Sequence, residues 1–234
     1  MSGNKLRAVL FGAIGSFSET SQLQLRCFNA AFALNGVDKQ WSKEEYVELL
    51  KVTQGGLPRL QHTFPNETAE FHETIYNDKN RLYQQKLKEG ESVLRPNFEA
   101  FCEHLVKNDI RIGIASTTHL ETIETVLSKS NIISPEHFDF IGHGGMDVRR
   151  KPAADIYEIA LKEMNVKPDE VVAIEDTHAN SMSAINAGIK QTIVVPGELC
   201  QDQDYSKAKV VSESFGALRS DAQLDSELAA AFAY

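Results

Sequence analysis

The sequence predicts an α/β protein, in which a doubly wound parallel sheet carries a small helical cap domain inserted after the first strand. Three observations predict it. Residues 6–11 form an apolar run with the length of a buried strand. Residues 21–89 then show helical spacing with almost no strand pattern, and beyond Pro96 strand-like and helical segments alternate. Such alternation is typical of parallel strands joined by right-handed helical crossovers.

The segment at residues 19–91 is predicted to form the cap. Ser42 and Glu45 have the spacing of a capping box, which predicts that a helix begins between them. The paired glycines at 55–56 interrupt the helical pattern, and residues 68–88 resume it. We therefore expect a cap built from helices.

The predicted core comprises residues 1–18 and 92–234. Pro152 is expected to open a helix that ends near Met164, because proline is tolerated in the first turn of a helix. The other predicted elements of the core are helices at 97–107, 120–129 and 181–187, and strands at 6–11, 110–115, 138–141, 171–174, 191–195 and 209–211.

Composition excludes several classes of function. The net charge of -9 argues against a nucleic-acid surface, which requires clustered lysine and arginine. No apolar stretch approaches the roughly 20 residues that cross a bilayer. Cys27, Cys102 and Cys200 are widely spaced and odd in number, which favours reduced thiols and a cytoplasmic location.

Polar residues follow several of the predicted strands. Ser116 and Thr117 end one strand, Lys151 stands ahead of a predicted helix, and Glu175 and Asp176 end another strand. Ligands of such sheets bind at the carboxyl ends of the strands, so these side chains are expected to share one site. A hydroxyl and a lysine suit a phosphate group, and two carboxylates suit Mg²⁺.

In this order the chain resembles the haloacid dehalogenase-like superfamily. The family's Asp-x-Asp-Gly-Thr loop corresponds to residues 12–16, its second motif to Ser116, its lysine to Lys151 and its acidic motif to Glu175 and Asp176. The helical insertion resembles the family's type-one cap. Finer features are similar to the xylulose bisphosphate phosphatase and β-phosphoglucomutase branch; these include residues 18–20, 28–29, 44–46, 55–56, 94–96 and 155–157.

The first motif departs from that family in the residues that react. The resemblance assigns the nucleophile, which is also a Mg²⁺ ligand, to the position of Gly12, and the general acid and base to the position of Ile14. Neither side chain can attack phosphorus or carry a proton, and general acid–base catalysis alone contributes about 10²–10⁴-fold. Ser16 and Ser18 are near, but no histidine or lysine flanks them as an activating base.

The resemblance also bears on the substrate side. It implies substrate contacts near Glu19 and Gln24, although the branch usually has a histidine near Gln24 and a lysine where this chain has Leu57. With one acidic ligand missing, Mg²⁺ binding through Glu175 and Asp176 is expected to be weakened, and no cofactor is assigned.

Three hypotheses remain open. The first is a catalytically degenerate homologue whose cleft binds an anion or phosphorylated metabolite through Ser116, Thr117 and Lys151. The loss of two carboxylates would leave less negative charge near these residues to oppose a bound anion. The second is a weak or atypical Mg²⁺-dependent sugar-phosphate phosphatase. The third is a protein-interaction module whose cleft has collapsed around a Lys151–Asp176 pair. If the scaffold is otherwise intact, aspartates at positions 12 and 14 should restore Mg²⁺ binding.

Overall fold

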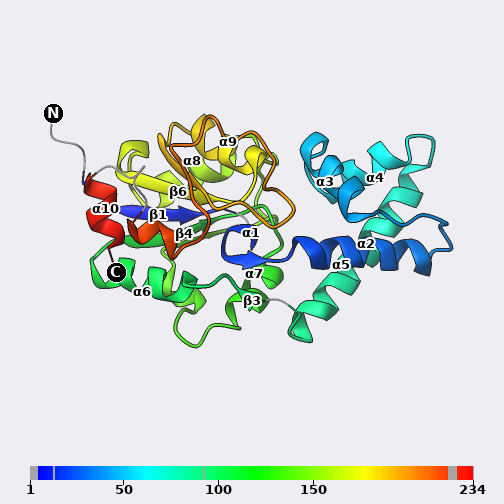
Figure 1. The fold of residues 1–234 in the computed structure, drawn as a ribbon, viewed down its shortest axis with the longest axis horizontal. Coiled ribbons are helices and arrows are strands. Elements are labelled where there is room, and N and C mark those ends of the chain that lie inside the picture. Colours follow the sequence, from blue (N-terminus) through cyan, green and yellow to red (C-terminus); the bar gives the residue numbers. More distant parts are fainter. Residues whose placement is uncertain (1–4, 13, 92, 221–225, 234) are drawn as a thin grey trace.

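A computed structural model of the protein describes residues 5–12, 14–91, 93–220 and 226–233. Its centre is a parallel sheet in the order β5-β4-β1-β6-β7-β8, which confirms the predicted doubly wound core (Figure 1). The strands are β1 (Ala8–Phe11), β4 (Arg111–Ala115), β5 (Phe140–Gly142), β6 (Val171–Glu175), β7 (Gln191–Val194) and β8 (Val210–Val211).

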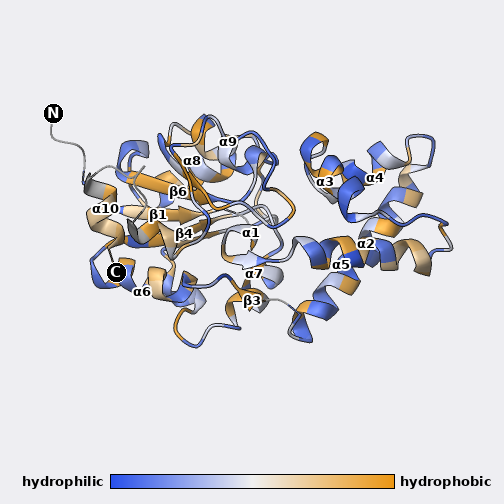
Figure 2. Cartoon of the chain, in the orientation of Figure 1, coloured by the Kyte–Doolittle hydropathy of each residue, from blue (hydrophilic) through white to orange (hydrophobic). Residues whose placement is uncertain are grey.

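Alternate residues of the strands enter two separate apolar layers, because successive side chains point to opposite faces of a sheet. Val9 and Phe11 pack toward the face covered by α6 (Phe98–Lys107), α7 (Leu120–Leu127) and α10 (Ser226–Phe232). Ala8 and Leu10 pack toward α8 (Asp155–Glu163) and α9 (His178–Asn186) on the other face. The strands are accordingly the most hydrophobic part of the chain (Figure 2).

The cap consists of helices that lie to one side of the sheet (Figure 1). They are α2 (Ser21–Leu34), α3 (Lys43–Val52), α4 (Gly56–Thr63) and α5 (Ala69–Lys88). The Ser42 hydroxyl accepts a hydrogen bond from the Glu45 amide at 3.1 Å, which confirms the predicted start of α3. An aromatic cluster that includes Phe28, Phe32 and Trp41 fills the interior of the cap.

Two short strands connect the cap to the core, and sequence reasoning missed them. β2 (Ser18–Glu19) pairs antiparallel with β3 (Val93–Leu94), and the Ser18 hydroxyl donates to the Val93 carbonyl at 2.9 Å. Each strand has two residues, too few to produce a recognisable alternation. The exact boundaries predicted for cap and core stay a prediction.

The prediction that Pro152 opens a helix was wrong, because α8 begins at Asp155. Side chains of α9 form hydrogen bonds with the backbone of the segment that precedes α8. Asn186 donates to the Pro152 carbonyl at 2.9 Å, and the Ser183 hydroxyl donates to the Ala153 carbonyl at 2.5 Å. These contacts fix the chain beside Lys151 in a non-helical turn.

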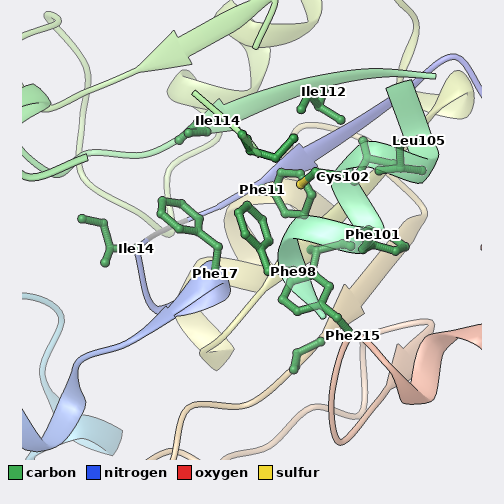
Figure 3. Packing of buried hydrophobic residues seen from close by; sticks show 14 of the residues in the cluster. Phe11, Ile14, Phe17, Phe98, Phe101, Cys102, Leu105, Ile112, Ile114 and Phe215 are labelled. Carbon is green, nitrogen blue, oxygen red and sulfur yellow. The ribbon is translucent and has the colours of Figure 1, made fainter. Parts of the chain in front are cut away.

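Among the described residues, we found no helix with the length and hydropathy needed to cross a membrane. All three cysteines are buried free thiols. α1 (Ile14–Phe17) is a single helical turn after β1. Its Phe17 side chain is buried in the core, where the Phe17 and Phe98 rings stack with their centres 5.3 Å apart. Ile14 lies at the edge of the same cluster (Figure 3).

Candidate functional site

A cleft of 580 Å³ separates the cap from the carboxyl ends of the strands. The core contributes Thr117, Lys151 and Asp176 to its wall, and the cap contributes Arg59 and Lys79. Three residues of the site predicted from the sequence therefore line this cleft, whereas Arg59 and Lys79 were not predicted. Ser116 and Glu175 lie beneath the cleft floor, fully buried.

The Glu175 side chain occupies the space beside Gly12. A methyl group built on Gly12 would overlap all three terminal atoms of the Glu175 carboxyl group. Gly12 continues the backbone of β1, and its amide donates to the Ile174 carbonyl at 2.9 Å. The absence of a side chain at position 12 is therefore what allows the Glu175 carboxylate to lie against this strand.

Glu175 is bound there by two buried partners. Its Oε1 atom lies 2.6 Å from Lys151 Nζ and accepts a hydrogen bond from the Tyr157 hydroxyl, also at 2.6 Å. The side chains of Lys151 and Glu175 are 5% and 0% exposed. Burial raises the pKa of Glu175, and the Lys151 ammonium opposes that rise. Burial likewise raises the pKa of Tyr157, so this hydroxyl stays a donor.

This arrangement corrects two expectations. Lys151 is not left unopposed by the missing carboxylates, because Glu175 neutralises it. The collapsed-cleft hypothesis expected Lys151 to pair with Asp176. In the structure the lysine pairs with Glu175. Asp176 instead packs against Gly15, and its Oδ1 atom accepts a hydrogen bond from the Asn180 side chain at 2.9 Å.

The donor set at this site does not fit the Mg²⁺ ion that the family resemblance implies. Mg²⁺ requires several oxygen ligands in nearly octahedral geometry. Gly12 supplies no side-chain oxygen, and one oxygen of Glu175 is engaged by Lys151 and Tyr157. Within the described part of the chain, no group of three or more acidic, histidine or cysteine side chains is placed to hold a metal.

The remaining residues of the predicted phosphate site are held in the core. The Ser116 hydroxyl is buried and accepts a hydrogen bond from the Thr118 amide at 3.0 Å, while Thr117 reaches the cleft. Ile14, at the position of the acid and base, is 4% exposed and packs in the apolar cluster beside the cleft. A phosphate contact by Ser116 or Thr117 stays a prediction.

Glu19 has a structural role in β2, one of the two short strands that connect the cap to the core. One carboxylate oxygen accepts from the Ser21 amide at 2.8 Å, and the other accepts from the Glu198 amide at 2.7 Å. Arg95 forms an ion pair with it at 3.5 Å. Because both oxygens are engaged, Glu19 joins the start of the cap to the core, and its implied substrate contact stays a prediction.

A core loop after β7 reaches into the cap. Leu199 is 2% exposed and belongs to the aromatic cluster of the cap. The neighbouring Glu198 carboxylate accepts from Gln22 at 2.8 Å and pairs with Lys43 at 3.3 Å. We call residues 197–203 the cap latch, because Gln203 also donates to the Leu50 carbonyl at 3.4 Å. The latch therefore joins the core to α2 and α3 of the cap.

Gln24 contacts a lysine that sequence reasoning missed. Its amide oxygen accepts from Lys79 Nζ, which also lies 5.1 Å from the Phe28 ring centre and 4.8 Å from that of Tyr83. Lys79 is 4% exposed, and burial lowers its pKa to about 7. The sequence did contain a pattern that indicates burial of this lysine. Positions four residues apart lie on one face of a helix, and that face of α5 carries Ile75, Lys79 and Tyr83.

Arg59 is the second cation on the cap side of the cleft. It is 6% exposed, its guanidinium lies 4.9 Å from the Tyr46 ring centre, and one terminal nitrogen donates to the Tyr46 hydroxyl at 3.2 Å. Its buried Nε atom has no hydrogen-bond partner among the described residues. The Arg59 side chain nevertheless lines the cleft, so its guanidinium group forms part of the cap-side wall.

Comparison with known proteins places the chain in a well-defined group. A sequence model described as haloacid dehalogenase-like hydrolase matches residues 15–194. The chain is 35% identical to the protein CbbY of Cereibacter sphaeroides over 226 residues, which cover 94% of this chain and 97% of that protein.

Solved structures show the same similarity. CbbY from Rhodobacter sphaeroides in complex with phosphate superposes with a TM-score of 0.81 at 33% identity, covering 91% of this chain and 96% of that one. A mutant of that protein in complex with xylulose-(1,5)bisphosphate gives a TM-score of 0.82 at 33% identity, covering 94% and 99%. These similarities extend over both the core and the cap.

Gly12→Ala should destabilise the fold by about 1–3 kcal/mol, because the new methyl group must displace the Glu175 carboxylate from Lys151 and Tyr157. The cost should nearly disappear in a Glu175→Ala background, where the overlapping atoms are absent. Urea unfolding of the four proteins measures this coupling. Gly197→Ala is the control, since a methyl group there meets no atom closer than 3.5 Å. Additive effects of the two substitutions would contradict the packing described.

Lys151→Met should lower the free energy of unfolding by about 3–5 kcal/mol, because it leaves a buried carboxylate unpaired. The pKa of Glu175 then rises further, so the folded state binds this proton more tightly than the unfolded chain. The loss should therefore be smaller near about pH 5 than near about pH 8. Urea unfolding at both pH values tests this, with the surface pair variant Lys39→Met as the control. An equal loss at both values would argue against an ionised Glu175.

Proposed function

This chain belongs to the haloacid dehalogenase-like hydrolase family, and we propose that it is a member that binds a small phosphorylated metabolite without hydrolysing it. The observation that carries the proposal is the Glu175 carboxylate lying against Gly12 and bound to Lys151. The position that the family uses for its nucleophile is thus filled by a carboxylate already neutralised by the lysine.

Neither Ile14 nor Ser18 replaces the missing chemistry. Ile14 is aliphatic and buried, so it transfers no proton. Ser18 is fully buried and donates its hydroxyl hydrogen to the Val93 carbonyl of β3. Loss of both covalent attack and proton transfer removes the two contributions that a phosphatase of this type depends on.

The cap side of the cleft supports binding of an anion. No carboxylate within the described residues forms an ion pair with Arg59 or Arg150, and both side chains line the cleft. A terminal nitrogen of Arg150 lies beside Gly55, next to the start of α4, which carries Arg59. Guanidinium groups form paired hydrogen bonds with phosphate oxygens, so the two arginines provide an anion site that Glu175 does not oppose.

The phosphate and xylulose-(1,5)bisphosphate bound by the CbbY structures support a phosphorylated compound as the ligand class. In this chain we place the phosphate near Arg59 and Arg150, because the core lysine is occupied. A protein partner and the cytoplasmic location expected from the free thiols stay predictions.

Two measurements test the proposal together. Calorimetric titration should detect binding of xylulose 1,5-bisphosphate, and the same protein with Mg²⁺ should release no inorganic phosphate above a heat-denatured control. Phosphate release that Lys151→Ala abolishes would instead establish the atypical phosphatase. Absence of both binding and release would favour the protein-interaction module.

Arg59→Gln should weaken that binding by about 10–100-fold, because it removes a charge-assisted hydrogen bond worth about 1.5–3 kcal/mol. Arg81→Gln is the matched control: this arginine lines the cleft too, but it is 59% exposed and paired with Asp78. The melting temperature of each variant separates lost binding from lost folding. Equal affinity in both variants would remove Arg59 from the site.

A further inference from the structure

Two lysines are buried on opposite sides of the cleft, and their surroundings differ in kind. Lys151 is 6% exposed and lies 2.6 Å from a carboxylate. Lys79 is 4% exposed, yet no carboxylate of the described residues pairs with it; its amine contacts the Gln24 amide oxygen and lies 3.4 Å from the Asn80 side-chain oxygen. A buried ammonium without a counter-charge is costly, so a purely structural role does not explain Lys79.

Burial favours the neutral amine of Lys79. Burial is the main cause that lowers its pKa to about 7, and the positive charge of Arg59 on α4 acts in the same direction. Cys27 on α2 opposes burial, and its effect is larger than that of Arg59. The rings of Phe28 on α2 and Tyr83 on α5 form the apolar wall around the amine. A neutral amine facing a cleft is a nucleophile toward carbonyl carbon.

We propose that Lys79 forms an imine with the carbonyl carbon of a phosphorylated aldehyde or ketone held in the cleft. This inference rests on the proposed function, because the phosphate must first be bound by the cap arginine. Arg59 lies over the Tyr46 ring and Lys79 over the Phe28 ring, and the centres of these two rings are 6.2 Å apart. One small ligand would therefore place its phosphate at Arg59 and its carbonyl group at Lys79.

The reaction balances without an external oxidant or reductant. The Lys79 lone pair forms a bond to the carbonyl carbon, and a proton moves from nitrogen to the carbonyl oxygen to give a carbinolamine. The oxygen then leaves as water, taking the second amine proton, and a carbon–nitrogen double bond remains. When the imine is protonated, the faces of Phe28 and Tyr83 stabilise its positive charge.

Reductive trapping tests the proposal directly. The intact protein is incubated at neutral pH with glyceraldehyde 3-phosphate and sodium cyanoborohydride, and the labelled lysines are identified by peptide mass. Lys86 on the same helix is the internal control, since it is exposed to solvent and paired with Glu89 and Glu91. At neutral pH the neutral fraction of Lys79 should exceed that of an ordinary lysine by roughly a thousand-fold. Because Lys79 is less accessible, we expect its labelling to exceed that of Lys86 by at least about tenfold.

Two variants and one competitor complete the design. Lys79→Arg should abolish the dominant adduct while Lys86→Arg leaves it unchanged, and the melting temperatures confirm that both variants fold. Glycerol 3-phosphate, which carries no carbonyl group, should slow the labelling. Unphosphorylated glyceraldehyde should label Lys79 more slowly, because it lacks the group that Arg59 would bind.

The outcomes separate the two proposals. Comparable labelling of Lys79 and Lys86, or an adduct that survives Lys79→Arg, would overturn the imine. If glycerol 3-phosphate raises the melting temperature but glyceraldehyde 3-phosphate leaves no adduct on Lys79, the inference fails and the proposed metabolite binding stands. If neither compound raises the melting temperature and no adduct forms, both proposals fail.

Discussion

The buried ion pair between Lys151 and Glu175 is the interaction on which the rest of the site depends. Two charges beneath a protein surface persist only when each neutralises the other, and Tyr157 satisfies the carboxylate further. The pair fits because Gly12 leaves space for it at the end of β1. One glycine thus determines the electrostatics of the core end of the cleft: its lysine is neutralised and its glutamate is withdrawn from the solvent.

The consequence is a site whose positive charge lies on the cap side. Arg59 sits on the aromatic interior of the cap beside the buried amine of Lys79, and Arg150 approaches the same region from the core. A protein with this distribution can hold an anion on the cap side, away from the Glu175 carboxylate.

Much of the fold and part of this site could be predicted from the sequence. The strands of the sheet are continuous apolar runs and the helices repeat at helical spacing, so both appear in the pattern. Gly12, Lys151 and Glu175 follow from motif order, because strand ends converge at one edge of a parallel sheet. The partner of Lys151 could not be predicted, since it depends on which carboxylate has space to approach. Arg59 and Lys79 were missed because an isolated cation on a helix is usually solvated, and only tertiary packing buries it.

The cap latch has a bearing on how quickly the cleft can exchange its contents. Leu199 packs in the apolar cluster of the cap although its backbone belongs to the sheet domain, so one side chain from the core completes the interior of the cap. Wide opening would withdraw that side chain into water and break the contacts of Glu198 with Gln22 and Lys43. The latch therefore restrains wide separation of cap and core, and any exchange that required such separation would be slowed by the cost of exposing Leu199.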